Sequence, residues 1–269
     1  MINYKNLILI SFLASFMFSS QMGNYYNGAI PSFTKTPKKG KINFENHFGF
    51  AMVNQKFENG KLVSLLEDQK TNLIAHQTRF RYHGMHAAGI DLIVDGLIST
   101  KETDDFTKNS NTTTFGVYWS WDEMFTYKTP AFIPWQDGYT FPSTRNLTGL
   151  YFSENYAYLK HSMDFVFGPK MILSGFLDLT NDKVYSDSVN KLGLRLIYDI
   201  NNNFSVAGGL IYSEEALLLN ILGGYQFKNV SAGNLKMNFK LVPSISLMVD
   251  SDNQPAMHFI NLGLHTYFN

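Results

Sequence analysis

Three side chains of the types used in nucleophilic catalysis lie close together in the sequence, at His161, Ser162 and Asp164. A serine nucleophile needs a histidine base within hydrogen-bond reach and a third group that orients the histidine. On a β-strand, however, adjacent residues such as His161 and Ser162 point to opposite faces. The chain also lacks a Gly-x-Ser-x-Gly segment, which would place a serine on a sharp turn. We therefore expect a protein that is not an enzyme, and lipid hydrolysis remains the weakest hypothesis.

Metal and acid–base chemistry have little support from spacing. His83 and His86 flank a turn, but two turn histidines are more often solvated polar groups than ligands. Asp91 and Asp95 share one strand face at a separation of about 13 Å, given the rise of a strand. That distance is too long for an acid–base pair unless the strand curves. The sequence therefore predicts no catalytic residue, no cofactor and no metal site.

The elements that carry these residues are β-strands, because apolar residues recur at every second position. In 188–200, Leu192, Leu194 and Leu196 fall on one side, and Gly193 and Arg195 on the other. A helix would scatter this pattern around its circumference, whereas a strand gathers it on one face. The pattern recurs in about twelve segments: 41–56, 71–83, 87–99, 112–122, 146–153, 156–167, 170–180, 188–200, 204–213, 216–227, 234–249 and 256–268.

Composition decides what these strands form. Charged residues make up 16% and aromatic residues 15%, the net charge is zero, and cysteine is absent. Nucleic-acid binding needs a basic surplus, so that function is excluded. A soluble sandwich leaves a charged face in water, whereas these polar faces are rich in Gly, Ser, Asn and Thr. Runs of about ten residues with aromatic ends are typical of tilted membrane strands. We predict an all-β fold, an antiparallel up-and-down transmembrane β-barrel of about twelve strands, with an exported sandwich as the alternative.

The first segment indicates export. Residues 1–20 contain a lysine, then an apolar run, then two serines, which is the pattern of a secretory signal peptide. The apolar run is shorter than the roughly 20 residues of a spanning helix. We therefore expect a signal peptide over 1–20, a periplasmic N-terminal segment over 21–40, and an outer-membrane barrel over 41–269.

One long connection, 123–145, does not alternate. It holds Phe132, Trp135 and Tyr139 among three prolines, so it folds into the lumen, covers one mouth, or hides two further strands of a fourteen-stranded barrel. Pro243 interrupts another strand, because proline cannot donate a ladder hydrogen bond, and marks a bulge or an edge-like break. These four residues are the candidate plug or docking positions.

The charged side chains on the polar faces are expected to line the lumen. A ring of one sign would indicate an ion-selective channel, whereas mixed signs favour charges that pair with one another. The lumen-facing candidates are Glu45, Arg79, Arg81, Asp91, Asp95, Asp122, Lys160, Asp164, Asp178, Arg195, Asp199, Lys236 and Lys240.

Four stretches carry a family resemblance: 141–162, which contains FP, GLYF and YAY; 89–97, which contains GIDL and Asp95; 241–247, LVPSISL, followed by Pro255; and 21–28, with Gln21 and YYNG. They resemble the PorP/SprF family, outer-membrane barrels of Bacteroidota associated with type IX secretion and gliding. The family's N-P-A box is absent, with 29–31 reading Ala-Ile-Pro in its place.

The resemblance implies a non-enzymatic barrel that anchors or assists exported surface proteins. Its partners would be outer-membrane lipid and a secreted adhesin or secretion component. The alternative from the residues alone is a porin-like diffusion channel for small solutes, because a barrel of this size has a polar lumen. Conductance and copurification separate the two hypotheses.

Overall fold

The computed structural model describes residues 29–37, 40–58, 61–84, 87–101, 109–123, 127–128, 140–141, 144–154, 156–167, 170–182, 190–213, 216–232, 235–250 and 255–268. The expected signal peptide therefore lies outside the described residues, as do Phe132, Trp135 and Tyr139 of the long connection. Within the described part of the chain, no helix is long and apolar enough to cross a bilayer.

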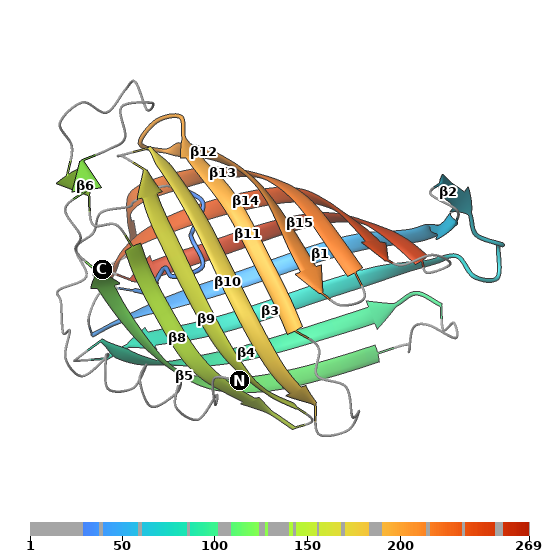
Figure 1. Cartoon of the computed structure of the whole chain (residues 1–269), viewed down its shortest axis with the longest axis horizontal. Coiled ribbons are helices and arrows are strands. Elements are labelled where there is room, and N and C mark those ends of the chain that lie inside the picture. Colours follow the sequence, from blue (N-terminus) through green and yellow to red (C-terminus); the bar gives the residue numbers. More distant parts are fainter. Residues whose placement is uncertain are drawn as a thin grey trace.

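Twelve antiparallel strands close into a barrel (Figure 1). Each strand pairs with its neighbours in the barrel order, and the last strand pairs with the first from Asn43↔Tyr267 to Lys56↔Pro255. This confirms the prediction of an all-β barrel. The barrel strands are β1 (Lys41–Glu58), β3 (Thr71–His83), β4 (Ala88–Ser99), β5 (Asn109–Glu123), β8 (Thr144–Ser153), β9 (Tyr156–Phe167), β10 (Met171–Asp182), β11 (Asn190–Asp199), β12 (Phe204–Ser213), β13 (Ala216–Ala232), β14 (Leu235–Asp250) and β15 (Pro255–Phe268).

Three short strands lie outside this ring. β2 (Lys61–Ser64) pairs with the end of β1 and lengthens that hairpin beyond the wall. β6 (Tyr127–Lys128) and β7 (Thr140–Phe141) pair only with each other in a separate sheet. The alternative of two further barrel strands within 123–145 is therefore wrong for the residues that the structure describes.

Pro243 breaks pairing without a bulge. The β13–β14 ladder runs from Leu222↔Ser244 to Tyr225↔Leu241 in the same register, and the register shift in this pair lies at Phe227/Val230 instead. Pairing of Pro243 with Leu262 of β15 continues unbroken. Of the two sequence expectations, the bulge is wrong and the interruption holds.

The outer wall is apolar along its length. Phe48, Ile221 and Ile245 are 58%, 74% and 68% exposed, and many other Phe, Leu, Ile and Tyr side chains on outward positions are similarly open. A soluble protein does not leave so large an apolar surface in water, whereas a lipid bilayer requires it. Residues of opposite parity on the same strands face the interior and are mostly buried.

The barrel has two distinct ends. The turn end is where β1 begins and β15 finishes, and the loop end is where β1 finishes and β3 begins (Figure 1). At the turn end, Gly40 has a φ of 71°, a conformation that suits glycine, and its N–H donates to the carbonyl of His83 at 2.7 Å. This bend carries the chain into β1. The Asn201 side chain accepts from the N–H of Phe204 at 2.9 Å, which closes the turn before β12.

Large rings on the inner wall lie over glycines. Tyr151 pairs across the strands with Gly116, and Phe176 with Gly193. A Cβ added at Gly116 would lie 2.3 Å from the Tyr151 ring, and one at Gly193 would lie 2.0 Å from the Phe176 ring. Only a residue without a side chain leaves room for these rings, so the glycines of the polar faces set where the aromatics pack.

Because the outer wall faces lipid, a charged side chain on it should destabilise the barrel more strongly the deeper it lies in the bilayer. We expect Ile221→Arg, on β13 opposite the middle of β12, to lower the free energy of unfolding by about 2–4 kcal/mol, because the cation enters the bilayer core. The matched control is Leu66→Arg, since Leu66 is 67% exposed but lies in the loop after β2. That change should stay within about 0.5 kcal/mol. Denaturant unfolding of the barrel in lipid vesicles measures both, and equal losses would contradict a lipid-facing wall.

Candidate functional site in the barrel lumen

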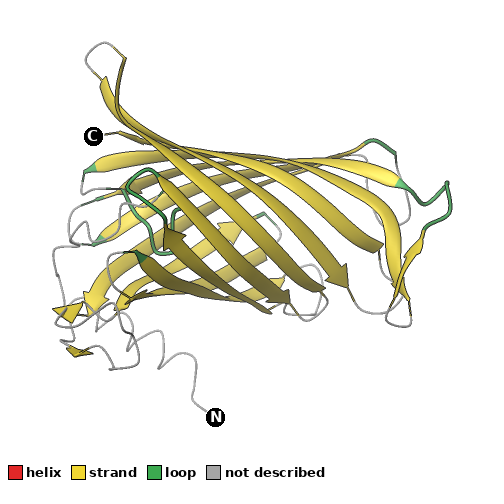
Figure 2. Cartoon of the chain, turned by 90° about the horizontal axis from the view of Figure 1, so that it is seen from above, coloured by secondary structure: helices red, strands yellow, loops and turns green. Residues whose placement is uncertain are grey.

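The described N-terminal segment, 29–37, lies inside the barrel at the turn end (Figure 2). Its Ile30 is fully buried and packs into an apolar socket on the inner wall. The socket residues come from five consecutive strands, Ile172, Ile197, Ala207, Leu222 and Val242. The sequence places this segment in the periplasm as part of 21–40, whereas the structure places its described residues against the interior wall.

Backbone and hydroxyl groups hold the segment on either side of Ile30. The N–H of Ala29 donates to Ser205 Oγ at 2.8 Å, and the N–H of Phe33 donates to Ser174 Oγ at 2.9 Å. Thr34 Oγ1 donates to Asp164 Oδ2 at 2.5 Å, and Ser174 donates to the other oxygen of Asp164, also at 2.5 Å. Asp164 therefore organises both the wall and the segment, which is a structural role rather than a catalytic one.

Two cations also contact the segment. The guanidinium of Arg195 lies 4.5 Å from the centre of the Phe33 ring, and that ring packs edge-on against Phe176 at 4.7 Å. Arg81 Nη1 donates to the carbonyl of Lys35 at 2.5 Å. The segment thus reaches from the apolar socket to the charged part of the wall.

The charged part of the wall centres on Asp91, which is fully buried. Arg81 binds it through two atoms, Nε to Oδ1 at 2.7 Å and Nη2 to Oδ2 at 2.8 Å. Arg79 Nη2 and the hydroxyl of Tyr151, the latter at 2.8 Å, donate to the same Oδ2. Two guanidiniums on one carboxylate leave local positive charge, so the interior is not a set of isolated neutral pairs.

The other predicted lumen charges fall into smaller groups. Lys160 pairs with Asp178 at 3.2 Å and lies 4.0 Å above the Phe176 ring, and Lys240 lies 5.0 Å above the Tyr267 ring. Two acidic side chains accept from neutral groups, Asp95 from Gln77 at 2.6 Å and Asp199 from Ser205 at 2.5 Å. Lys236 is exposed, and the side chain of Asp122 is outside what the structure describes.

The structure does not bring His161, Ser162 and Asp164 together as a catalytic site. His161 Nδ1 pairs with Thr148 Oγ1 at 2.8 Å, the buried Ser162 hydroxyl has no hydrogen-bond partner, and Asp164 holds the N-terminal segment. The Ser162 hydroxyl is therefore not activated by His161. Of the two turn histidines, His86 lies outside the described residues, and His83 Nδ1 contacts the hydroxyl of Tyr118 at 3.3 Å.

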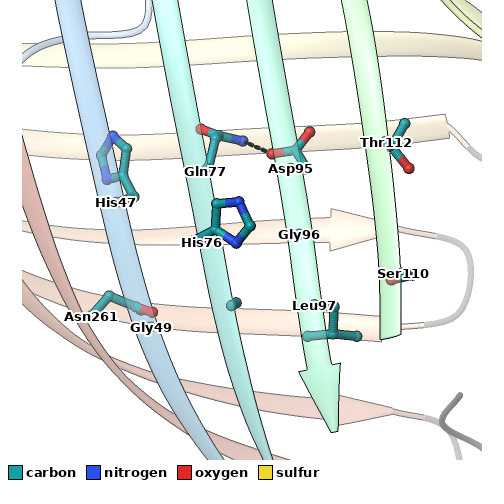
Figure 3. A pocket seen from close by; sticks show the side chains of 11 residues that line it. His47, Gly49, His76, Gln77, Asp95, Gly96, Leu97, Ser110, Thr112 and Asn261 are labelled. Carbon is teal, nitrogen blue, oxygen red and sulfur yellow. Dashed lines mark hydrogen bonds between the residues drawn. The ribbon is translucent and has the colours of Figure 1, made fainter. Parts of the chain in front are cut away.

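A cavity of about 290 Å³ occupies the loop half of the lumen (Figure 3). On the inner face of β3, Arg81, Arg79, Gln77 and Ala75 follow one another from the turn end toward the loop end, so the cavity lies beyond the charged cluster. Seven of its eleven lining residues carry hydrogen-bonding side chains, and Asp95 is the acidic one among them. The lining includes His47, Gln77, Asp95, Ser110, Thr112 and Asn261.

Sequence reasoning missed several of these residues. Ile30 sits in a segment without periodicity, so nothing in the sequence marks it as buried. Asn261 and His265 were recognised only as part of the last strand. A detectable signal was Glu45-x-His47, since residues two apart on a strand share a face. These two side chains and His265 each offer a ligand atom, and the three atoms lie within 4.8 Å of one another.

No known protein family matches the sequence, and no curated protein matches it. The PorP/SprF resemblance therefore finds no support. Several solved outer-membrane channels are similar in fold. A channel from Pseudomonas putida F1 has a TM-score of 0.56 at 12% identity, over 88% of this chain and 99% of that one. The KdgM porin has a TM-score of 0.45 at 8% identity, over 81% of this chain and 97% of that one. At such identities the likeness shows the fold alone.

The buried cluster at Asp91 predicts a large cost for removing its charge. Asp91→Asn leaves the buried Arg81 and the half-buried Arg79 without the anion that they bind, so we expect the free energy of unfolding to fall by about 3–5 kcal/mol. Asp95→Asn is the matched control, because Asp95 is half-buried and binds a neutral amide; we expect a loss of about 1 kcal/mol. Denaturant unfolding monitored by tryptophan fluorescence compares the two. A loss at Asp91 no larger than at Asp95 would show that the cluster does not stabilise the barrel.

Proposed function

We propose that this chain is an outer-membrane channel for small polar solutes, with residues 29–37 as a plug at the turn end. The observation that carries the proposal is the cavity of about 290 Å³ inside a membrane-spanning barrel, most of whose lining residues have hydrogen-bonding side chains. A barrel that serves only as an anchor needs no internal cavity lined with hydrogen-bonding groups. The similarity in fold to a Pseudomonas putida outer-membrane channel also supports the proposal of a channel.

The anchoring role that the family resemblance implies has no observation in its favour. Its motif stretches 141–162 and 241–247 supply wall residues of the barrel where the structure describes them, with pairings that any barrel strand would make. The proposed channel therefore replaces anchoring as the main hypothesis.

The lining of the cavity points to the solute class. His47, Gln77 and Asn261 present imidazole and amide groups, and Ser110 and Thr112 present hydroxyls. Such groups both donate and accept hydrogen bonds, which suits solutes that carry several hydroxyl or amide groups. The cavity carries the acidic Asp95, and the neighbouring cluster leaves positive charge at Arg79 and Arg81, so an ion of either sign meets a like charge. We propose that uncharged polar solutes pass best.

The plug predicts that conductance rises when Ile30 loses its socket. Ile30→Asp puts a carboxylate among five apolar side chains, so the segment should leave the wall, and the mean single-channel conductance in planar bilayers should increase several-fold. Ile30→Val keeps an apolar side chain of similar shape and should behave like the unchanged protein.

Two outcomes would contradict the parts of this proposal separately. Silence of both the unchanged protein and Ile30→Asp in long recordings would remove the channel. Equal non-zero conductance of the two would retain the channel and remove the plug. Heat-modifiable migration on gels confirms in each case that the barrel is folded.

Solute selectivity gives an independent prediction. In liposomes that contain the protein, we expect a neutral pentose to cause faster swelling than the pentonate anion or an amino-sugar cation of similar size. The physical reason is that an anion meets Asp95 in the cavity and a cation meets Arg79 and Arg81 in the neighbouring cluster. A channel that passes either ion faster than the neutral sugar would contradict the proposed solute class while leaving conduction intact.

A further inference from the structure

We propose that Glu45, His47 and His265 form a binding site for a divalent transition-metal ion, zinc above all, on the inner wall of the barrel. This goes beyond conduction, because it assigns an inorganic ligand to a group of side chains of which His47 alone also lines the cavity. The three residues place one ligand atom each within 4.8 Å of the others.

Barrel closure brings the three side chains together. Glu45 and His47 are two apart on β1 and share its inner face, and Glu45 lies directly opposite His265 of β15. His47 lies opposite Gly263, one inward position along from His265 on the same strand. The two imidazole rings meet edge to face, with centres 4.8 Å apart. Residues more than two hundred positions apart in sequence thus form one compact group.

Gly263 leaves the room in which the two rings converge. A Cβ at this position would lie 2.9 Å from Nδ1 of His47 and 3.2 Å from Nε2 of His265. Any larger residue at 263 would push the imidazoles apart. The notch that Gly263 leaves therefore lets His47 and the Nε2 edge of His265 approach each other, while Nδ1 of His265 lies beside the carboxylate of Glu45.

The Glu45–His265 contact has the spacing of two ligands rather than of a hydrogen bond. His265 Nδ1 lies 3.5 Å from Glu45 Oε1, and this buried nitrogen has no hydrogen-bond partner. A charge-assisted hydrogen bond between such groups would measure about 2.7–2.9 Å. Two ligand atoms on a tetrahedral zinc ion, with bonds of about 2.1 Å, lie about 3.4 Å apart. His47 offers the third ligand atom, within 4.8 Å of the other two.

The surroundings orient the carboxylate and supply charge. Asn43 Nδ2 donates to Glu45 Oε1 at 2.6 Å, the kind of outer contact that fixes a metal-binding carboxylate. Arg79 lies opposite Glu45 on β3, but its Nη2 is bound to Asp91, together with Arg81. Asp91 therefore binds both guanidiniums, and their remaining positive charge lies beside Glu45, whose carboxylate is also 3.5 Å from His265.

The ligand types select the metal. Two imidazoles and one carboxylate are the donor set of three-ligand zinc sites that keep a fourth position open. Calcium and magnesium prefer oxygen ligands alone, so they should bind poorly. His47 also lines the cavity, so an ion can arrive through that space, and water there completes its coordination.

Titration of the full-length barrel, purified in detergent without a histidine tag, tests the site with zinc chloride. We expect calorimetry to show a single zinc ion per chain, and cobalt(II) in its place to give the visible absorption of four-coordinate binding. His47→Gln, Glu45→Gln and His265→Gln should each weaken binding by about 10–100-fold or more. Magnesium chloride should give no comparable heat.

His258→Gln is the matched control, since His258 lies on the same β15 and its Nε2 contacts Gln55 at 3.1 Å, away from the site. It should bind zinc like the unchanged protein.

Heat-modifiable migration on gels identifies any variant that fails to fold. Gly263→Ala keeps all three ligands but fills the notch, so it serves as the second variant and should weaken zinc binding. The proposal is overturned if the unchanged protein binds no zinc, or if folded ligand variants bind as tightly as His258→Gln. Either result leaves conductance, and so the proposed function, unaffected.

Discussion

The need to satisfy every backbone N–H and C=O within a bilayer governs this structure. Water is absent from the bilayer core, so a sheet with a free edge would leave a row of unpaired groups, and only closure removes it. The pairing of β1 with β15 is that closure. This pairing fixes which residues of β15 lie opposite Glu45 and His47. It also places the first residues of β1 at the turn end of the ring. The preceding segment, 29–37, then enters the interior rather than the bilayer, because its polar backbone finds partners such as Ser174 and Ser205 only there.

A ring of twelve strands has a narrow interior, and its inward residues fill most of it. Aromatic rings that lie over glycines of neighbouring strands, as Tyr151 does over Gly116, fill the space next to the wall. Charges that cannot reach bulk water pair instead, as Arg81 does with Asp91. The cavity persists where the inward residues of the loop half are small, among them Gly49 and Ala75. Small side chains at one level and large ones at the next therefore decide where the lumen is open.

The strands were predictable because their two faces meet different solvents. The alternation in 188–200 anticipates β11 (Asn190–Asp199) closely, since a lipid-facing side and a polar side leave a strong period of two. Contacts between side chains across the barrel interior leave no such periodic pattern in the sequence. The sequence suggested mixed lumen charges but not that Arg79 and Arg81 share Asp91, because register between distant strands decides partners. The burial of Ile30 was unpredictable for a related reason. Its segment has no periodic pattern, and the socket that buries this side chain exists only in the closed barrel.

The backbone connections of the interior groups indicate which part of the lumen can rearrange. Contact strength does not separate them. In the N-terminal segment, burial of Ile30 contributes about 1.5–3 kcal/mol, each neutral hydrogen bond about 1 kcal/mol, and the bond of Thr34 to the Asp164 carboxylate about 1.5–3 kcal/mol. Breaking the group around Asp91 costs about 3–5 kcal/mol. However, Arg79, Arg81 and Asp91 belong to strands whose backbones are fixed by the ladder on both sides, whereas the segment 29–37 is joined to the wall in sequence only through the bend at Gly40. In the proposed channel, the segment therefore moves while the charged wall stays in place, so the segment is the control element and the wall the selectivity element.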